Sequence, residues 1–371
     1  MSGNVGDEGA EPGTDRVISG RYRLLTPLGR GRTGTVWRAR DEVLAREVAV
    51  KEVRAPAGLD TAGAQRLYRR LERDAWAAAR VSHRGIVAVY DVASEDGRPW
   101  IVTELVRGLS LADVLGSGGP MDPQRAAHLG EQVLAALRSA HGSGVLHRDV
   151  RPGNVLIAND GRVVLSDFGG GGPEDFPEDS PEPVAAAGSP EFLAPERVPG
   201  REPGPESDLW SLGVMLYAAV EGVQPFLRET PAATLRAVVE EEAPPPRRAG
   251  PLAPVLEGLL RKDPAERLSA PEAARMLRVV GAGGTVRPPG GPVAEPDTPT
   301  ATAHHHDHGH DRDRDDDGHA PQGGGPYGVP AAPAEGSAPG SGREGRAGLL
   351  LAAGVAVILL ALAALGWLVL R

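Results

Sequence analysis

The sequence contains no cysteine among its 371 residues, so disulfide bonds and thiolate-ligated metal sites are excluded. Lysine is nearly absent as well, since only Lys51 and Lys262 occur among 40 basic residues. The formal net charge is −10. The basic excess that is typical of proteins binding duplex nucleic acid is therefore missing, and we expect no nucleic-acid partner.

The start of the chain lacks any apolar segment, and residues 1–20 are rich in Gly, Asp and Glu without periodicity. We expect them to be disordered and to contain no signal peptide. Residues 21–280 alternate apolar runs with turn residues, as a folded domain does. Residues 281–347 are rich in Pro, Gly, His and Asp, which predicts a solvated, disordered linker. Its part at 304–319 can alternatively bind Zn²⁺ or Ni²⁺ loosely through histidines.

One long apolar run is present: residues 348–370 contain no charge and are long enough to cross a bilayer as a helix. Arg343 and Arg346 precede this run and only Arg371 follows it, which favours a cytoplasmic N-terminal domain by the positive-inside rule. We therefore expect a single-pass protein of the cell membrane with no room for an external domain. Small residues in the run permit pairing of two helices, and hence a homodimer: Ala352, Gly354 and Ala356.

A glycine pattern near the N-terminus suits phosphate binding. Gly29, Gly31 and Gly34 are followed by Val36 in a β-prone stretch, and a second β-prone run lies at 46–53. The G-x-G-x-x-G pattern alone also fits a dinucleotide-binding turn, but that turn opens a helix rather than a strand. A strand–loop–strand arrangement lets backbone N–H groups cover phosphate oxygens without hindrance from side chains.

Lys51 lies in the middle of the second β-prone run, where an unpaired ammonium facing the interior would be costly. Its position indicates anionic partners, namely an acidic side chain and phosphate oxygens. The following segment, residues 64–80, has helical periodicity, and Asp74 shares its apolar stripe with two leucines. Asp74 is therefore the candidate partner of Lys51; alternatively it only caps or borders the stripe.

Three oxygen-bearing side chains surround a predicted hairpin later in the chain. Asp149 and Asn154 belong to the string HRDVRPGN at 147–154, and Asp167 follows a turn at 159–161. A nucleotide site needs oxygen ligands for Mg²⁺ and an acid that orients the attacking hydroxyl. These three residues supply both.

The ordered set of motifs resembles the bacterial, eukaryotic-like serine/threonine protein kinases of the membrane-attached kind common in actinobacteria. The order is glycine loop, strand lysine, HRD…N, DFG and APE (194–196), within residues 21–280. The resemblance implies an α+β, bilobal protein-kinase fold with a small β-rich N-lobe and a larger helical C-lobe, followed here by the linker and one transmembrane helix. It also implies that Asp208 braces the catalytic loop and that Arg267 pairs with Glu196.

The same resemblance implies a reaction, the transfer of the γ-phosphate of ATP to Ser/Thr hydroxyls of protein substrates, including the chain itself. ATP is expected with Mg²⁺, or alternatively Mn²⁺. The implied catalytic residues are Lys51, Asp74, Asp149 and Arg151, and the implied metal ligands are Asn154 and Asp167. The implied ATP-binding residues are Leu28, Gly29, Gly31, Gly34, Val36 and Lys51, with Thr103 before a hinge that contains Glu104 and Val106.

Three features depart from the family pattern. Asp74 stands where the family has glutamate and is one methylene, about 1.5 Å, shorter. No threonine, the usual activation phosphosite, occurs between Phe168 and Ala194. The same segment instead contains the acids Glu174, Asp175, Glu178, Asp179 and Glu182. These acids can partly replace an activating phosphate near Arg148, or they form a solvated loop without that role.

The third departure is Arg151, which stands where the family has lysine. Its guanidinium keeps the positive charge and can bind phosphate with two donors, and replacement is expected drift in a lysine-poor chain. Two functions therefore remain open. An active membrane-tethered kinase is favoured by the complete set of Lys51, Asp149, Asn154 and Asp167, and the alternative is a pseudokinase that binds nucleotide as a scaffold or regulatory module.

Overall fold

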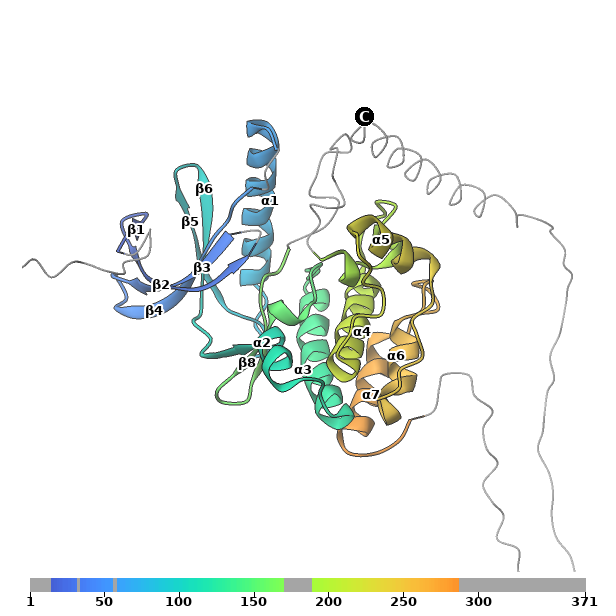
Figure 1. The fold of residues 1–371 in the computed structure, drawn as a ribbon. Helices are drawn as coiled ribbons and strands as arrows, with labels where there is room; N and C mark the ends of the chain where they lie inside the picture. Colours follow the sequence, from blue (N-terminus) through green and yellow to red (C-terminus); the bar gives the residue numbers. More distant parts are fainter. Residues whose placement is uncertain (1–14, 32–33, 56–58, 170–188, 287–371) are drawn as a thin grey trace, which may run out of the picture. The chain divides into compact units, whose positions relative to one another are not determined.

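The structure is a computed structural model of the chain, and it describes residues 15–31, 34–55, 59–169 and 189–286. These residues form one lobe dominated by β-strands and one dominated by α-helices (Figure 1). The α+β, bilobal prediction is thereby confirmed for them. Within these ranges no helix is long and apolar enough to cross a bilayer. The predicted transmembrane helix, most of the predicted linker and most of the predicted N-terminal tail fall outside the described residues.

The N-lobe is built on a six-stranded antiparallel sheet with the order β1-β2-β3-β4-β6-β5. Burial alternates along β3 from Trp37 to Asp41, which sends one set of side chains into a core shared with Tyr22 and Trp100. The strands span Val17–Ile18 (β1), Tyr22–Gly31 (β2), Gly34–Asp41 (β3), Arg46–Glu52 (β4), Val89–Glu95 (β5) and Arg98–Thr103 (β6).

Helix α1 (Thr61–Ala79) packs on β5 and β6 and buries Leu67, Ala75 and Ala78. It begins three residues before the predicted helix at 64–80, because the Asp60 side chain caps it by accepting the backbone N–H of Gly63 at 2.7 Å. The packing on β5 and β6 fixes the helix to the N-lobe sheet, and it therefore determines which residues of α1 point toward the C-lobe and which point to solvent.

Helix α4 is the centre of the C-lobe, with every residue from Ser207 to Val220 buried. A helix that is buried on all sides has no amphipathic pattern, and its Trp210 stacks on Phe226 with ring centroids 5.3 Å apart. Helix α3 is capped by Asp122, whose side chain accepts the backbone N–H groups of Gln124 and Arg125. The helices span Leu111–Gly118 (α2), Pro123–Gly142 (α3), Pro205–Glu221 (α4), Pro231–Glu240 (α5), Ala253–Leu259 (α6) and Ala270–Gly281 (α7).

A second, three-stranded sheet positions the HRD and DFG motifs. Its strands are β7 (Gly108–Ser110), β8 (Val155–Ala158) and β9 (Val163–Leu165), in the order β7-β8-β9. The HRD loop connects α3 to β8, and the DFG residues follow β9 after Ser166. Because β8 and β9 form an antiparallel hairpin, the two motifs leave the sheet close together. The described residues also contain short 3₁₀ helices at Pro152–Asn154, Pro190–Phe192, Pro195–Arg197 and Gly250–Leu252.

Candidate active site

The backbone of the HRD loop is held by the Asp208 carboxylate at the start of α4. The backbone N–H groups of His147 and Arg148 donate to it at 2.9 and 2.8 Å, and the His141 ring nitrogen lies 2.7 Å from it. Burial alone would raise the pKa of Asp208, but these partners hold it below its ordinary value. The predicted bracing by Asp208 is confirmed, and it stabilises Arg148 in a left-handed conformation with φ of 68°.

A second group holds the same peptide from its carbonyl side. The guanidinium of Arg197, which is 2% exposed, donates to the backbone oxygen of Arg148 at 2.7 Å. Arg197 directly follows the APE motif, and sequence reasoning missed it because a bond to a backbone carbonyl leaves no residue pattern. The loop is thus fixed by an acid on its N–H groups and by an arginine on its carbonyl.

His147 is a neutral scaffold residue of this loop. Its ring accepts the backbone N–H of Asp149 at Nδ1 (3.1 Å), and its Nε2 lies 2.8 Å from the backbone oxygen of Ser166. The ring also contacts the Phe168 ring, with centroids 4.5 Å apart. Burial lowers the pKa of His147, so the neutral tautomer that these two bonds require is favoured.

The Asp149 carboxylate is oriented by two neighbours. The side-chain amide of Asn154 donates to Asp149 Oδ2 and to the Asp149 backbone oxygen, each at 2.8 Å, and Arg151 Nε donates to Oδ2 at 3.0 Å. Asn154 is buried at 2% exposure, so its position is fixed by packing. The predicted closeness of Asp149 and Asn154 is therefore present, and Arg151 lies beside both.

Lys51 extends from β4 toward the DFG aspartate. Its ammonium lies 2.9 Å from Asp167 Oδ1, and in the sheet it is registered opposite Val36 of β3. Burial would raise the pKa of Asp167, but the charge of Lys51 holds it below its ordinary value. The strand lysine, the glycine hairpin and Asp167 consequently share one end of the N-lobe.

The predicted pairing of Asp74 with Lys51 is corrected by the structure. Among the described residues Asp74 forms ion pairs with Arg70 at 3.5 Å and with Arg148 at 3.4 Å, and none joins it to Lys51. Asp74 also packs against Gly169, where an added Cβ would lie 2.4 Å from the Asp74 Cβ. The shorter aspartate thus lies against the DFG glycine and the HRD arginine, and Lys51 pairs with Asp167 instead.

The predicted ATP-binding residues lie on β2, β3, β4 and the end of β6, and on the segment after β6. Gly31 and Gly34 face each other at the tip of the β2–β3 hairpin, and Leu28 is half exposed on the same hairpin. Gly34 has a φ of 139°, and a Cβ there would lie 1.7 Å from the Glu52 backbone oxygen, so only glycine fits.

The predicted hinge follows β6 directly. Thr103 is the last residue of that strand, and its hydroxyl donates to the Glu104 backbone oxygen at 3.2 Å. The Glu104 side chain accepts the backbone N–H of Ala88 at 3.1 Å, and Val106 is partly buried. The segment that joins the two lobes is therefore anchored to the N-lobe.

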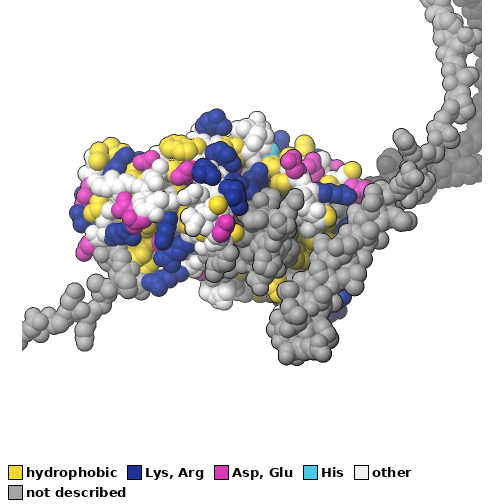
Figure 2. Space-filling view, turned by 90° about the horizontal axis from the view of Figure 1, so that it is seen from above, with side chains coloured by type: hydrophobic (Ala, Val, Ile, Leu, Met, Phe, Trp, Pro, Cys, Tyr) yellow, Lys and Arg dark blue, Asp and Glu magenta, His cyan; other side chains and the backbone are white. Residues whose placement is uncertain are grey.

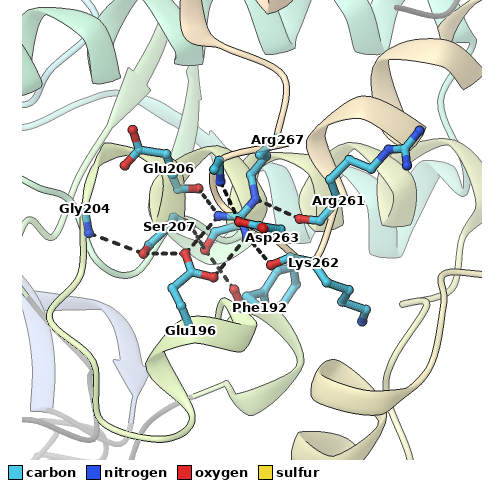
Figure 3. A network of polar contacts seen from close by, with 11 residues as sticks. Phe192, Glu196, Gly204, Glu206, Ser207, Arg261, Lys262, Asp263 and Arg267 are labelled. Carbon is cyan, nitrogen blue, oxygen red and sulfur yellow. Dashed lines mark hydrogen bonds and ion pairs between the residues drawn. The ribbon is translucent and has the colours of Figure 1, made fainter. Parts of the chain in front are cut away.

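The predicted pair of Glu196 and Arg267 is confirmed as the centre of a buried network (Figure 3). Two guanidinium nitrogens of Arg267 donate to the two Glu196 oxygens at 2.8 and 3.0 Å, and the Ser207 hydroxyl donates to Glu196 at 2.8 Å. Burial would raise the pKa of Glu196, but Arg267 holds it below its ordinary value. The network joins the APE turn to α4 and to the segment before α7.

The metal ligands implied by the resemblance supply two of the oxygen atoms that a hard cation needs. No group of three or more His, Asp or Glu side chains that could hold a metal alone occurs within the described ranges. Asp167 offers a carboxylate, and Asn154 offers its amide oxygen because its nitrogen already donates to Asp149. Two protein oxygens suit Mg²⁺, which in nucleotide sites completes its shell with phosphate oxygens and water.

Comparison with known proteins assigns the family. Residues 22–277 match the family model of the protein kinase domain, so the chain belongs to that family. The serine/threonine-protein kinase PknB of Mycolicibacterium smegmatis is 35% identical over 67% of this chain and 40% of the relative. The serine/threonine-protein kinase PrkC of Bacillus subtilis is 32% identical over 69% and 39%, respectively. The chain thus spans about two fifths of these curated relatives.

A solved structure agrees with this assignment. The kinase domain of PknI from Mycobacterium tuberculosis is similar with a TM-score of 0.55 and 25% sequence identity, and the match covers 72% of this chain and 99% of that domain. The resemblance to bacterial Ser/Thr protein kinases is confirmed for the kinase region. The acids Glu174, Asp175, Glu178, Asp179 and Glu182 lie outside the described residues, so their proposed role stays a prediction.

Proposed function

We propose that the chain is an active serine/threonine protein kinase that transfers the γ-phosphate of ATP to protein hydroxyls, including its own. The observation that carries this proposal is the orientation of Asp149 by Asn154 and Arg151 within a loop braced by Asp208. A pseudokinase has no need for an acid positioned in this way, so that alternative is not favoured.

Asp149 has one oxygen left for a substrate. The donors from Asn154 and Arg151 both end on Oδ2, so Oδ1 is the atom that accepts the proton of an incoming Ser or Thr hydroxyl. Hydrogen bonding to Oδ1 aligns the hydroxyl oxygen with the γ-phosphorus. In phosphoryl transfer this alignment supplies much of the catalysis, because the transition state needs little covalent assistance.

The phosphate side of the reaction uses cationic and backbone groups. The Lys51 ammonium binds phosphate oxygens, which compete with Asp167 for it when ATP enters. Backbone N–H groups at the β2–β3 hairpin cover the phosphates, and Arg151 offers its remaining guanidinium N–H groups to the transferred group. A bound Mg²⁺ or Mn²⁺, held by Asn154 and Asp167, would neutralise phosphate charge.

A phosphorylation assay on the full chain tests this function. With labelled ATP and either metal, Lys51→Ala and Asp149→Asn should each lower autophosphorylation and peptide phosphorylation by about a hundredfold or more. Arg236→Ala is the control, because it removes an exposed basic side chain from the C-lobe and should leave the rate within about twofold. ATP binding without turnover in the unmodified chain would instead support the pseudokinase function.

We further propose that the kinase is tethered to the cell membrane by residues 348–370, with its folded domain in the cytoplasm. The support is the uncharged apolar length of that run and the excess of arginines before it. Membrane fractionation of the full chain and of a variant without 348–370 tests the tether. The full chain should sediment with membranes, and the shortened one should not; two-chain cross-linking then tests pairing through Ala352, Gly354 and Ala356.

A further inference from the structure

Helix α1 presents a cationic face to solvent. Five exposed residues recur on it at intervals of three or four, which places them on one side of the helix: Arg66, Arg69, Arg73, Trp76 and Arg80. Seen from above, Lys and Arg side chains gather over the middle of the described surface, where α1 lies (Figure 2). We call this surface the arginine face of α1, and it is opposite the buried face of the helix.

The arginine face lacks counter-charges. Among the described residues none of its four arginines forms an ion pair, whereas the neighbouring Arg70 pairs with Asp74. Glu72 borders the face but forms no ion pair with any of the four. Like charges three and four residues apart on a helix repel one another, so an unneutralised face destabilises α1. An anionic partner would remove that repulsion.

The C-terminal half of the face contains a hollow with room for a side chain. An open depression of about 740 Å³ is lined by Arg73, Trp76, Ala77, Ala79, Arg80 and Val89. Trp76 is 50% exposed, although an indole of this size is seldom left half in water on a helix. A flat indole between two guanidinium groups suits an aromatic side chain flanked by carboxylates.

A segment of this chain outside the described residues has that chemistry. Residues 173–182 read PEDFPEDSPE, with five acids, no base and the single aromatic Phe176 between two Glu/Asp pairs. We propose that this segment binds the arginine face of α1, with Phe176 in the hollow beside Trp76 and the flanking carboxylates on the arginines. The acids thus neutralise α1, and Arg148, which already pairs with Asp74, is not their main partner.

The acidic segment starts close enough to α1, and is long enough, to reach the arginine face. Gly169, the last described residue before it, packs against Asp74 of α1. Phe176 lies seven steps along the chain from Gly169, and these steps can span about 23 Å when extended, whereas a helix with its side chains is only about 10 Å across. The chain therefore reaches the outer face of α1, and intramolecular attachment raises the effective concentration of the acids there.

Disulfide trapping tests this proposal, because the chain has no cysteine of its own. The full chain with Ala79→Cys and Pro177→Cys keeps every proposed charge and both aromatic rings. Under mild oxidation it should form an intrachain disulfide at least tenfold faster than the control pair Val43→Cys and Pro177→Cys. Val43 is 70% exposed and lies in the turn between β3 and β4, away from α1.

Charge dependence separates docking from random collision. Adding Arg69→Glu and Arg73→Glu to the Ala79/Pro177 pair should slow trapping at least fivefold, and exchanging Glu174 and Asp175 for arginine in that variant should restore it. Equal rates at Ala79 and Val43 would overturn the proposal. A disulfide between two chains would also overturn it, because the arginine face would then bind the acidic segment of a second copy of the protein. A third outcome would also overturn the proposal and assign the arginine face to lipid. In that outcome the Ala79/Pro177 disulfide does not form, and the chain binds phosphatidylglycerol vesicles unless Arg69→Glu and Arg73→Glu are present.

Discussion

The Asp74 carboxylate lies 3.4 Å from the Arg148 guanidinium, so the acid of α1 is joined to the catalytic loop. Lys51, the residue that the sequence suggested as its partner, pairs with Asp167 at 2.9 Å. Two ion pairs, Asp74–Arg148 and Lys51–Asp167, therefore stand in place of the expected pair of Asp74 and Lys51. Because Arg148 belongs to the loop that carries Asp149, the position of α1 is coupled directly to the catalytic acid.

Asp74→Glu should increase activity by restoring the longer acid. The additional methylene extends the carboxylate by about 1.5 Å, and we expect the longer acid to compete with Asp167 for Lys51. We expect kcat/KM for ATP to rise about three- to tenfold, which corresponds to about 0.7–1.4 kcal/mol of transition-state stabilisation. Steady-state kinetics with ATP as the varied substrate measures this change.

Asp74→Asn is the matched control for that variant. It keeps the size of the side chain but removes the charge that faces Arg148, so it should lower the free energy of unfolding by about 1 kcal/mol without raising kcat/KM. An unchanged kcat/KM in Asp74→Glu would mean that the extra methylene is accommodated against Gly169 and does not reach Lys51.

Arg197 should act as a positioning residue for the reaction. Arg197→Lys keeps the charge but loses the planar guanidinium that reaches the Arg148 carbonyl, so we expect kcat to fall about tenfold with little change in the KM for ATP. Exposed Arg247→Lys is the control. A fall in thermal stability alone, with kcat unchanged in the molecules that remain folded, would show that Arg197 serves only the packing of the C-lobe.

Local patterns were sufficient to predict that Asp149, Asn154 and Asp167 lie around one hairpin, because residues close in sequence there are also close in space. The Glu196–Arg267 pair followed from the family resemblance. The partner of Asp74 could not be predicted, since it depends on where α1 lies relative to two loops and on a difference of one methylene. Arg197 was missed because its partner is a backbone carbonyl, which every residue has.

Arg151 should tolerate replacement by lysine but not by alanine. Its Nε donates to Asp149 Oδ2 at 3.0 Å, and a lysine ammonium can reach the same oxygen while keeping the positive charge. We expect Arg151→Lys to change kcat less than threefold, and Arg151→Ala to lower it about thirtyfold, or roughly 2 kcal/mol. Single-turnover phosphorylation of a peptide measures both, and an active Arg151→Ala would exclude contact with the transferred phosphate.

Stability should fall in acid because two buried carboxylates are held ionised. The pKa values of Glu196 and Asp208 lie below their ordinary values of 4.5 and 3.8. A group with a lowered pKa in the folded state contributes stability above its unfolded pKa, and that stability is lost as the pH falls through the folded value. We therefore expect the contribution of these groups to stay constant from pH 7 to about 5 and to decline below that.

Glu196→Gln isolates one of these contributions. It removes a charge that is hydrogen-bonded to Arg267 and Ser207, so the free energy of unfolding at pH 7 should fall by about 3 kcal/mol. As the pH falls below 4.5 the deficit should shrink, because Glu196 is protonated first in unfolded wild-type molecules and then, at its lowered pKa, in folded ones. Urea unfolding from pH 7 to 3 measures the difference, with the exposed Glu257→Gln as control. Parallel curves over the whole range would mean that Glu196 is not held ionised by Arg267.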